Sequence, residues 1–470
     1  MQPSQFTVRV PLPEQDQVFL LNTLTDAQLL VTPDVVPLLD RAGAGGPFTA
    51  EERETLTLLA DEGFIVPSRE SEQDTLKEYF ANVREDGDTL RVTVLTTLQC
   101  NFACDYCLQG DHDDHNLFAH KMSLETAARV AGWIKDRLDA VKPRRLALTF
   151  FGGEPLLNLP VIYYLAEQGH TLTQAAGARQ TINIVTNGLL LTPELVGRLK
   201  PFGLSGVKVT LDGDKETHDR MRPLRGRQGT FDRIVENVRR VADQVAITIG
   251  GNFDEDSVKS YPALLDFLKQ QEFADKLAKI NFKPIIKTAP TKPAMPKGFI
   301  PLTAVTDHGK PLGGACMTSA GAGTGGGCDS CNLLDDQMDF LRDETRKRGF
   351  PTVDGVHMGP CEIHRKNAHT ISPDGDLHAC PGFAADATQA MGHIDGRSSS
   401  ALQASARRFD ALAAYKNCGD CAFIPVCAGG CSVASHTELG DMNTPTCHKS
   451  SFESAVVGLA RSLAAGTALN

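Results

Sequence analysis

The chain has 470 residues, which is more than one ordinary domain needs, so we expect two or three domains. Hydrophobic residues make up 41% of it and charged residues 22%, a balance that excludes an intrinsically disordered chain. The net charge of −11 arises within residues 1–90, which hold 17 Asp and Glu against 6 Lys and Arg, while the other 41 acidic and 41 basic side chains cancel. A nucleic-acid-binding surface would be basic, so no nucleic-acid partner is expected.

The sequence carries no signal for a membrane or for export. It has no stretch of 18 or more consecutive apolar residues, and its first segment, MQPSQFTVRV, lacks a basic start followed by an apolar run. We therefore expect a cytoplasmic protein without membrane contact. The cytosol keeps cysteines reduced, so the 13 cysteines are interpreted as metal ligands and not as disulfides.

Residues 1–90 are predicted to form a small α+β module of winged-helix-like order. Pro33 marks a helix start, and Thr49 followed by Glu52 makes a capping box for a helix that runs to about Ala60. The acidic surface of this module serves either solubility or the docking of a basic peptide. Strands are expected at Gln5–Val10, within Gln17–Val31 and at Gly63–Val66, with a polar helix or linker at Leu76–Asp88.

Residues 91–286 alternate between strand-like and helix-like segments. Six such strands predict a parallel sheet with helices outside, and six units are too few for a closed eight-fold barrel. The expected fold class is therefore α/β, with a partial (β/α)6 TIM-like barrel as its core. In such sheets the chemistry gathers at the C-terminal ends of the strands. The predicted strands are Val92–Thr97, Leu146–Phe151, Ile182–Thr186, Val207–Leu211, Val245–Ile249 and Ile280–Ile286.

The alternation stops at residue 287. Residues 287–350 are rich in proline and glycine and are predicted to be a linker or insert, with a polar helix at Asp335–Arg348. A C-terminal cysteine-rich domain is expected over residues 351–450, and a last helix within residues 451–470.

Three cysteines follow the first predicted barrel strand with the spacing C-x3-C-x2-C, namely Cys100, Cys104 and Cys107. A fully ligated [4Fe–4S] cluster uses four cysteines. Three thiolates on one loop therefore leave an iron with an open coordination position, which a substrate or cofactor can take. The alternative is a zinc knuckle, although zinc sites favour four ligands and C-x2-C pairs.

This loop resembles that of the radical S-adenosylmethionine (SAM) superfamily. The resemblance implies that the open iron chelates SAM, that one electron from the cluster breaks the sulfonium bond, and that a 5′-deoxyadenosyl radical then abstracts hydrogen. Tyr106 matches the aromatic position near the adenine, and the GGEP segment after the second strand matches the part that binds the methionine end. For the matches at Asn187 and Asp212, ordinary turns at the ends of strands remain an alternative interpretation. The implied cofactor-binding residues are Tyr106, Gly152, Gly153, Glu154, Pro155, Asn187 and Asp212.

The seven cysteines between residues 361 and 447 are similar to those of the SPASM domain. The resemblance implies two auxiliary clusters, a distal one on Cys418, Cys421, Cys427 and Cys447 and a proximal one on Cys361, Cys380 and Cys431. Three [4Fe–4S] clusters are thus expected in all. Structural zinc sites are the alternative interpretation. A fourth ligand of the proximal cluster could come from Cys316, Cys328, Cys331 or His364, although His364 is expected to be a plain surface histidine. Without a fourth ligand, one iron of the proximal cluster keeps an open coordination position.

The combined resemblance implies a peptide or protein maturase, for example one that forms thioether or carbon–carbon crosslinks. Its implied partners are a precursor peptide or protein and a flavodoxin- or ferredoxin-type reductant, and residues 1–90 resemble, in order and size, the recognition elements fused to such maturases. The alternatives are a radical SAM enzyme acting on a small molecule or cofactor precursor, a sulfatase-type maturase, and a non-enzymatic metal-binding regulator. Sulfatase maturation is disfavoured because Pro381 stands where that branch usually carries an aspartate.

Overall fold

The computed structural model describes residues 1–107, 120–286, 329–352 and 359–466. Its central element is a nine-stranded sheet in which β6 to β11 lie side by side and parallel. Within the described residues β6 and β11 do not pair with each other, so the barrel is open, and the predicted fold class is confirmed. The six strands are β6 (Thr89–Thr97), β7 (Arg145–Gly152), β8 (Arg179–Thr186), β9 (Leu204–Thr210), β10 (Ala246–Phe253) and β11 (Leu277–Pro284).

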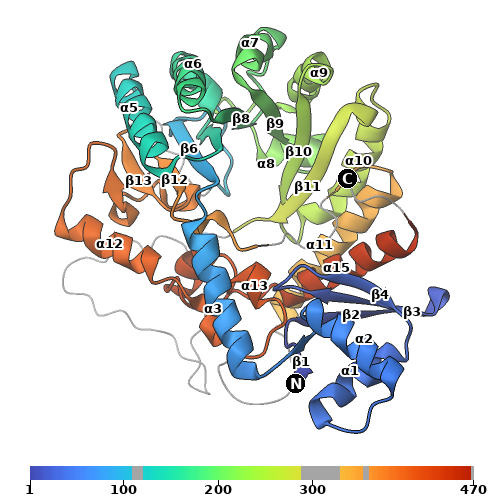
Figure 1. The fold of residues 1–470 in the computed structure, drawn as a ribbon. Coiled ribbons are helices and arrows are strands. Elements are labelled where there is room, and N and C mark those ends of the chain that lie inside the picture. The colour runs from blue at the N-terminus through green and yellow to red at the C-terminus, as the bar shows by residue number, and fades with distance from the viewer. Residues whose placement is uncertain (108–119, 287–328, 353–358, 467–470) are drawn as a thin grey trace, which may run out of the picture.

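Helices cover the outer side of this sheet in an arc (Figure 1). Alternate residues of β7, such as Leu148 and Phe150, are fully buried in the main core that the helices close, while the residues between them face the barrel interior. Ser123 caps the first of these helices through a bond from the Thr126 N–H, as predicted. The covering helices are α5 (Leu124–Val141), α6 (Leu159–Ala175), α7 (Pro193–Leu199), α9 (Phe231–Val241) and α10 (Tyr261–Lys269), and the short helix α8 (Lys215–Met221) packs against α9.

The C-terminal cysteine-rich region extends the same sheet. β12 (Ala368–Ile371) pairs in parallel with β6, and β13 (Asp376–His378) and β14 (Gly392–His393) follow it as antiparallel strands. This pairing places the cysteine-rich segment beside the first barrel strand. Helix α11 (Asp329–Lys347) precedes this region, whose helices are α12 (Ser400–Asp410), α13 (Ile424–Cys427) and α14 (Ser432–Ala434), and α15 (Lys449–Ala464) follows it.

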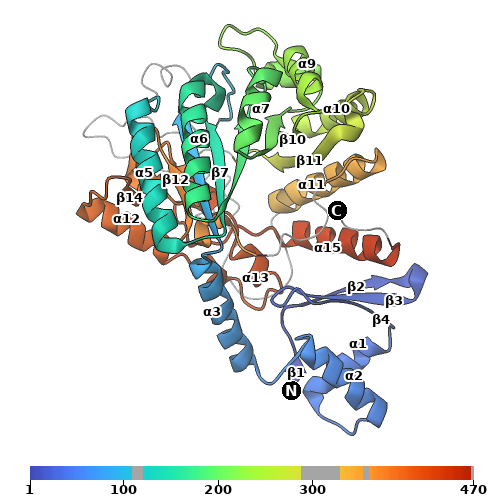
Figure 2. The ribbon, with the colours of Figure 1, turned by 45° about the horizontal axis from the view of Figure 1, so that its top comes forward.

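The N-terminal module forms a lobe at the bottom of the molecule (Figures 1 and 2). The Thr49–Glu52 capping box is present and opens α2. The helix expected from Leu76 begins earlier, at Arg69, because Ser68 caps it and accepts a bond from the Ser71 N–H. The elements are β1 (Gln2–Pro3), β2 (Thr7–Leu12), β3 (Gln17–Asn22), β4 (Gln28–Val31), α1 (Val35–Ala44), α2 (Ala50–Asp61), β5 (Ile65–Val66) and α3 (Arg69–Glu85).

Strand β3 is buried on both of its faces, which explains its continuous apolar run. Val18 and Leu20 belong to the core formed with α1 and α2. Phe19 and Leu21 belong to a second core, which they share with residues of α13 and α15 near the C-terminus. The module is therefore packed directly against the C-terminal cysteine-rich region.

None of the helices among the described residues is both long enough and apolar enough to cross a membrane.

Candidate functional site

The three cysteines of the C-x3-C-x2-C loop line one cavity of about 210 Å³. The loop follows β6 directly, and the other walls come from the C-terminal parts of β7, β8, β9, β10 and β11. The cavity therefore lies inside the open barrel at the end of the strands where the sequence placed the chemistry.

Burial dominates the chemistry of these thiols. It raises the pKa of Cys100 to about 12, with a further contribution from the nearby Glu154 carboxyl group. Burial also raises the pKa of Cys104 to about 11, although the neighbouring Arg222 opposes this rise. Such thiols keep their protons at neutral pH, so a metal that binds them must displace protons. Among the described residues no three His, Cys, Asp or Glu side chains form a group that could hold a metal ion.

Gly152 and Gly153 hold the end of β7 against the cysteine loop. The N–H of Gly153 donates to the Thr97 carbonyl at 3.0 Å, and the N–H of Glu154 donates to the Gln99 carbonyl at 2.8 Å. A Cβ atom at Gly152 would lie 2.2 Å from the Thr97 oxygen, and one at Gly153 would lie 2.3 Å from the Gln99 oxygen. Both positions therefore need glycine, because the two backbones touch.

Glu154 does not line the cavity but lies fully buried behind it. Its carboxylate accepts bonds from the Leu156 N–H at 2.9 Å, the Thr186 hydroxyl at 2.8 Å and the Asn187 N–H at 2.8 Å. Burial raises its pKa, and the three donors oppose that rise. In this structure Glu154 fastens the end of β8 to the end of β7.

Asn187 lines the cavity, and its side-chain amide donates to Asn101 in the cysteine loop at 2.7 Å. Pro155 is buried at the start of a short 3-10 turn, Pro155–Asn158, and is not among the residues that line the cavity. Of the predicted GGEP residues, the two glycines thus reach the cavity, and the other two support it from behind.

Tyr106 and Asp212 meet beside the cysteine loop, as part of a buried polar network. The Tyr106 hydroxyl donates to the Asp212 carboxylate, and the Arg222 guanidinium donates to that hydroxyl and lies 3.5 Å from Asp212. The backbone N–H of Asn252 donates to the other Asp212 oxygen at 2.7 Å. Burial raises the pKa of Tyr106 well above its usual value, so its hydroxyl stays protonated. The network ties the loop to the ends of β9 and β10.

Neither Arg222 nor Asn252 was among the predicted site residues. A signal for Arg222 was present, because it follows His218 by four residues. His218 Nδ1 accepts the Asp212 N–H at 3.1 Å, and its other ring nitrogen contacts the Thr230 hydroxyl at 3.0 Å. Burial lowers the pKa of His218 well below its usual value, so the ring is neutral and orients Asp212.

The proximal set brings Cys361, Cys380 and Cys431 together from three separated segments. The pKa of Cys380 is raised to about 12, first by burial and then by the neighbouring Cys361 and Cys431. His364 is partly buried, and burial lowers its pKa to about 4. Cys316 and Cys328, named as possible ligands, lie outside the described residues, and Cys331 lies in α11, where nothing is described of its side chain.

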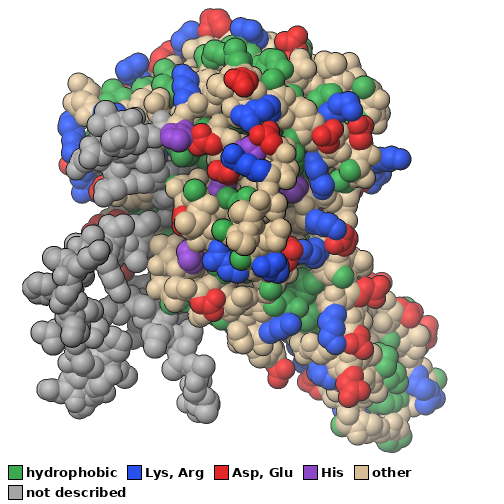
Figure 3. Space-filling model, turned by 90° about the vertical axis from the view of Figure 1, so that its left-hand side faces the viewer, with side chains coloured by type: hydrophobic (Ala, Val, Ile, Leu, Met, Phe, Trp, Pro, Cys, Tyr) green, Lys and Arg blue, Asp and Glu red, His purple; other side chains and the backbone are tan. Residues whose placement is uncertain are grey.

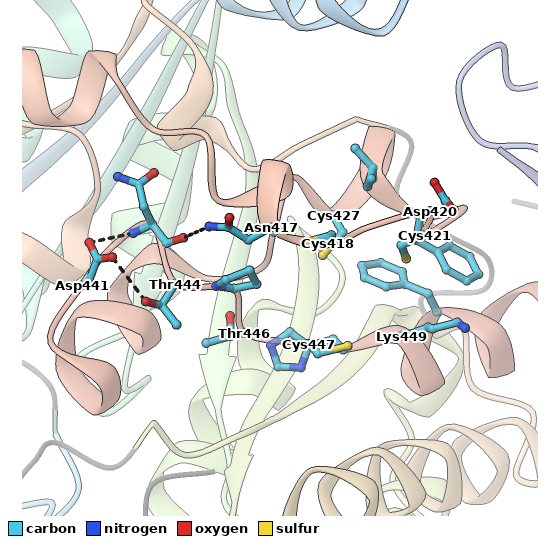
Figure 4. Close-up of a pocket in the computed structure, with 17 residues that line it drawn as sticks. Asn417, Cys418, Asp420, Cys421, Cys427, Asp441, Thr444, Thr446, Cys447 and Lys449 are labelled. Atoms are coloured by element: carbon cyan, nitrogen blue, oxygen red, sulfur yellow. Dashed lines mark hydrogen bonds between the residues drawn. The ribbon is translucent and has the colours of Figure 1, made fainter. Parts of the chain in front are cut away.

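The distal set surrounds a larger cavity of about 700 Å³, which is lined by Cys418, Cys421, Cys427 and Cys447 (Figure 4). The pKa of Cys427 is raised to about 12 by burial and by the other three cysteines. The ten described cysteines thus lie in three separate neighbourhoods, those of the loop, the proximal set and the distal set, and their roles as cluster ligands stay a prediction.

The profile of the Radical SAM superfamily matches residues 94–256. Fe-coproporphyrin III synthase of Methanosarcina barkeri is 30% identical over 180 residues, which cover 37% of this chain and 40% of that protein. A GTP 3′,8-cyclase of Synechococcus is 30% identical over 162 residues, which cover 34% of this chain and 43% of that protein. The chain thus spans about two fifths of the length of these relatives.

Among solved structures, anSMEcpe with bound AdoMet superposes with a TM-score of 0.55 and 16% sequence identity. The superposition covers 81% of this chain and 100% of that chain. At this identity the similarity is one of fold, and it extends beyond residues 94–256 to most of the chain.

Proposed function

We propose that this chain, whose residues 94–256 belong to the radical SAM superfamily of iron–sulfur enzymes, cleaves SAM reductively and modifies a peptide or protein substrate. The observation that carries the SAM chemistry is the single cavity shared by Cys100, Cys104, Cys107 and the Gly152–Gly153 turn. A [4Fe–4S] cluster held by the three cysteines would supply the electron that breaks the sulfonium bond and so generates the 5′-deoxyadenosyl radical.

The chain's own residues hold this site in place. In our proposal Gly152, Gly153 and Asn187 bind SAM directly, because they line the cavity next to the cysteines. Tyr106 packs beside the adenine, and Asp212 keeps that side chain oriented through the hydrogen bond between them. Glu154 and Pro155 support the two glycines from behind, and the three donors to Glu154 hold this support in place.

The proximal and distal cysteine sets are proposed to hold two auxiliary [4Fe–4S] clusters. The distal set supplies the four cysteines that a fully ligated cluster needs. The proximal set supplies three from the described residues, Cys361, Cys380 and Cys431, which leaves one iron for another ligand or for the substrate. A flavodoxin- or ferredoxin-type protein is the proposed electron donor, and the cytoplasm is the proposed location.

A peptide substrate is favoured by two independent features. The structure that resembles this chain over most of its length, anSMEcpe, has also been solved with bound AdoMet and the peptide Cp18Cys, at a TM-score of 0.54. The N-terminal module of residues 1–90 also offers a free sheet edge, since β4 pairs only with β3 among the described residues. An extended leader peptide can add to such an edge.

The charge of the module suggests which peptide it takes. Residues 1–90 carry a net charge of −11, and Figure 3 shows acidic side chains on the lobe that extends from the body of the molecule. A basic leader would be attracted to this lobe at low ionic strength.

A small-molecule substrate is the second candidate, and the curated relatives favour it. They include GTP 3′,8-cyclases and an AdoMet-dependent heme synthase, which is 30% identical to this chain over 171 residues. The sequence similarity to these relatives covers less than half of each protein, whereas the superposition with anSMEcpe covers most of this chain. Binding of a precursor peptide to the N-terminal module would separate the two candidates.

The first experiment is an anaerobic iron and sulfide count on reconstituted protein, paired with a dithionite-driven assay for 5′-deoxyadenosine. We expect about twelve irons per chain and formation of 5′-deoxyadenosine. The Cys104→Ala variant should lose SAM cleavage and keep about eight irons, because its change touches one cluster only. Zinc in place of iron, or unchanged cleavage in this variant, would contradict the proposal.

The leader-binding edge is tested with a proline in β4. The Asn22 N–H bonds to the Ala27 carbonyl, so by the antiparallel alternation the Leu30 N–H points away from β3. Leu30→Pro should therefore spare the β3–β4 ladder and remove one donor from the free edge. We expect the affinity of Leu30→Pro for a labelled precursor peptide to fall about tenfold, as measured by fluorescence anisotropy. The control Leu30→Ala keeps the backbone N–H and should bind the peptide several times more tightly than the proline variant. Equal affinities of the two variants would exclude edge pairing at this position.

A further inference from the structure

Two lysines project into the barrel cavity from strands that are far apart in the sequence. On β9, Val207 and Val209 are buried in the main core, so the intervening Lys208 faces the interior. On β11, Ile280 and Phe282 are buried in that core, and Lys283 lies on the opposite face, where its side chain is exposed to solvent. Both lysines line the same cavity as the cysteine loop.

The register of the strands directs both amines to one end of this cavity. Lys208 pairs with Thr248 on β10, and its side chain passes over Gly250, where a Cβ atom would lie 2.4 Å from Lys208 Cε. The next inward-facing residue of β10 is Asn252, which pairs with Lys283. Glycine at position 250 thus lets the Lys208 stem extend toward the level of Lys283.

The two lysines lie near each other, and Lys283 also lies near the Cys380 thiol of the proximal set. Among the described residues that line the cavity none is Asp or Glu, and the third cation there, Arg222, is already paired with Asp212. The structure gives neither lysine an ion pair or hydrogen bond within its described part. Burial lowers the pKa of Lys208, and the nearby Lys283 lowers it further. Two like charges near each other on the cavity lining repel each other, and an anion that binds between them would relieve this repulsion.

We propose that Lys208 and Lys283 form a binding site for a carboxylate group of the substrate inside the barrel. This inference rests on the proposed function, because a peptide supplies carboxylates from Asp and Glu side chains or from its C-terminus. The site positions that part of the peptide next to the cavity wall formed by the cysteine loop. It also selects for acidic character at the modified segment, whereas the N-terminal lobe selects for basic character in the leader.

The test measures amine labelling in the holoenzyme with SAM bound. Lys208 and Lys283 are acetylated under limiting reagent and quantified by peptide mass spectrometry, with the exposed Lys279 on β11 as an internal control. The probes are N-acetyl-glutamate α-amide for a side-chain carboxylate, N-acetyl-alanine for a terminal carboxylate, and the uncharged N-acetyl-glutamine α-amide. At about twice its dissociation constant, a carboxylate probe should slow labelling of both lysines about threefold, because only the unoccupied fraction reacts.

Further controls show which chemical group protects the two lysines. Lys279 and the glutamine probe should show no protection, and Lys283→Met should remove the protection of Lys208. The inference is overturned if no carboxylate protects, if the glutamine probe protects equally, if inorganic phosphate protects more strongly, or if protection of Lys208 persists in Lys283→Met. It is also overturned if SAM alone blocks labelling, since the lysines would then serve SAM. The labelling needs no turnover, so a failure of SAM cleavage in the 5′-deoxyadenosine assay is recognised separately.

Discussion

Substitution of Gly153 by alanine tests the idea that the strand β7 turn and the cysteine loop fit together by direct backbone contact. The added Cβ atom would lie 2.3 Å from the Gln99 carbonyl oxygen and 2.5 Å from that of Leu98. Both neighbours are backbone atoms, so no side chain can swing away. The loop would have to move by about 0.7 Å to reach even a strained 3.0 Å contact.

A movement of this size acts on the three cysteines directly. Overpacking of this kind costs about 1–3 kcal/mol, and a misplacement of about 1 Å at a reacting centre costs about a hundredfold in rate. We therefore expect Gly153→Ala to lower 5′-deoxyadenosine formation about a hundredfold and to weaken retention of the cluster on Cys100, Cys104 and Cys107. The auxiliary iron should stay, because those cysteines lie on other segments.

The matched control is Gly132→Ala in α5, where an added Cβ meets no atom within 4 Å. That change should leave activity intact and stabilise the helix by about 0.5–1 kcal/mol. Activity and iron content are measured for both variants under the same anaerobic conditions. Full activity and full iron content in Gly153→Ala would refute the reasoning that backbone contact at this turn fixes the loop.

Two further predictions concern buried charge. Arg222→Met leaves the fully buried Asp212 carboxylate without its ion pair, so it should lower the free energy of unfolding by about 3–5 kcal/mol in chemical denaturation. The control Arg220→Met changes an exposed residue of α8 and should alter this free energy by less than about 0.5 kcal/mol. Similar losses in the two variants would count against a stabilising role for the network. His369 packs against Trp133, neither of its ring nitrogens has a hydrogen-bond partner in the described part of the chain, and burial lowers its pKa to about 4 from 6.5. Below pH 6.5 this histidine is protonated in the unfolded chain but stays neutral in the folded protein, so the free energy of unfolding decreases as the pH falls. His369→Phe should remove about 2 kcal/mol of the decrease between pH 7.5 and 5. An unchanged pH dependence in thermal denaturation would show that His369 is accessible to protons in the folded protein.

The elements of the barrel were predictable because their signals are local. The six strands lie within a few residues of their predicted bounds, since each is a run of apolar residues that a helix or turn signal ends. The capping residues Ser123 and Thr49 accept the bonds expected of them, because capping depends on residues only three positions apart.

The polar contacts of the site were harder to predict from the sequence, because they join segments that only the folded chain brings together. The sequence identified Glu154 as a candidate, but its orientation depends on the Thr186 and Asn187 donors at the end of the next strand. Arg222 had a helical spacing from His218 but no local partner, since Asp212 and Tyr106 reach it from different loops. The alternation around Lys208 indicates which way it points, but nothing local indicates that Lys283 shares its cavity.

The double burial of β3 makes the N-terminal lobe inseparable from the rest of the enzyme. Phe19 and Leu21 cover Phe423, Val426 and Val456, which lie beside Cys421 and Cys427 of the distal set. A chain shortened to begin near residue 91 would expose these side chains, at a cost of about 1.5–3 kcal/mol for each large apolar group. For engineering, the exchangeable unit is therefore residues 1–90 together with α13 and α15, and a transplanted lobe must bring its own distal cysteine segment with it.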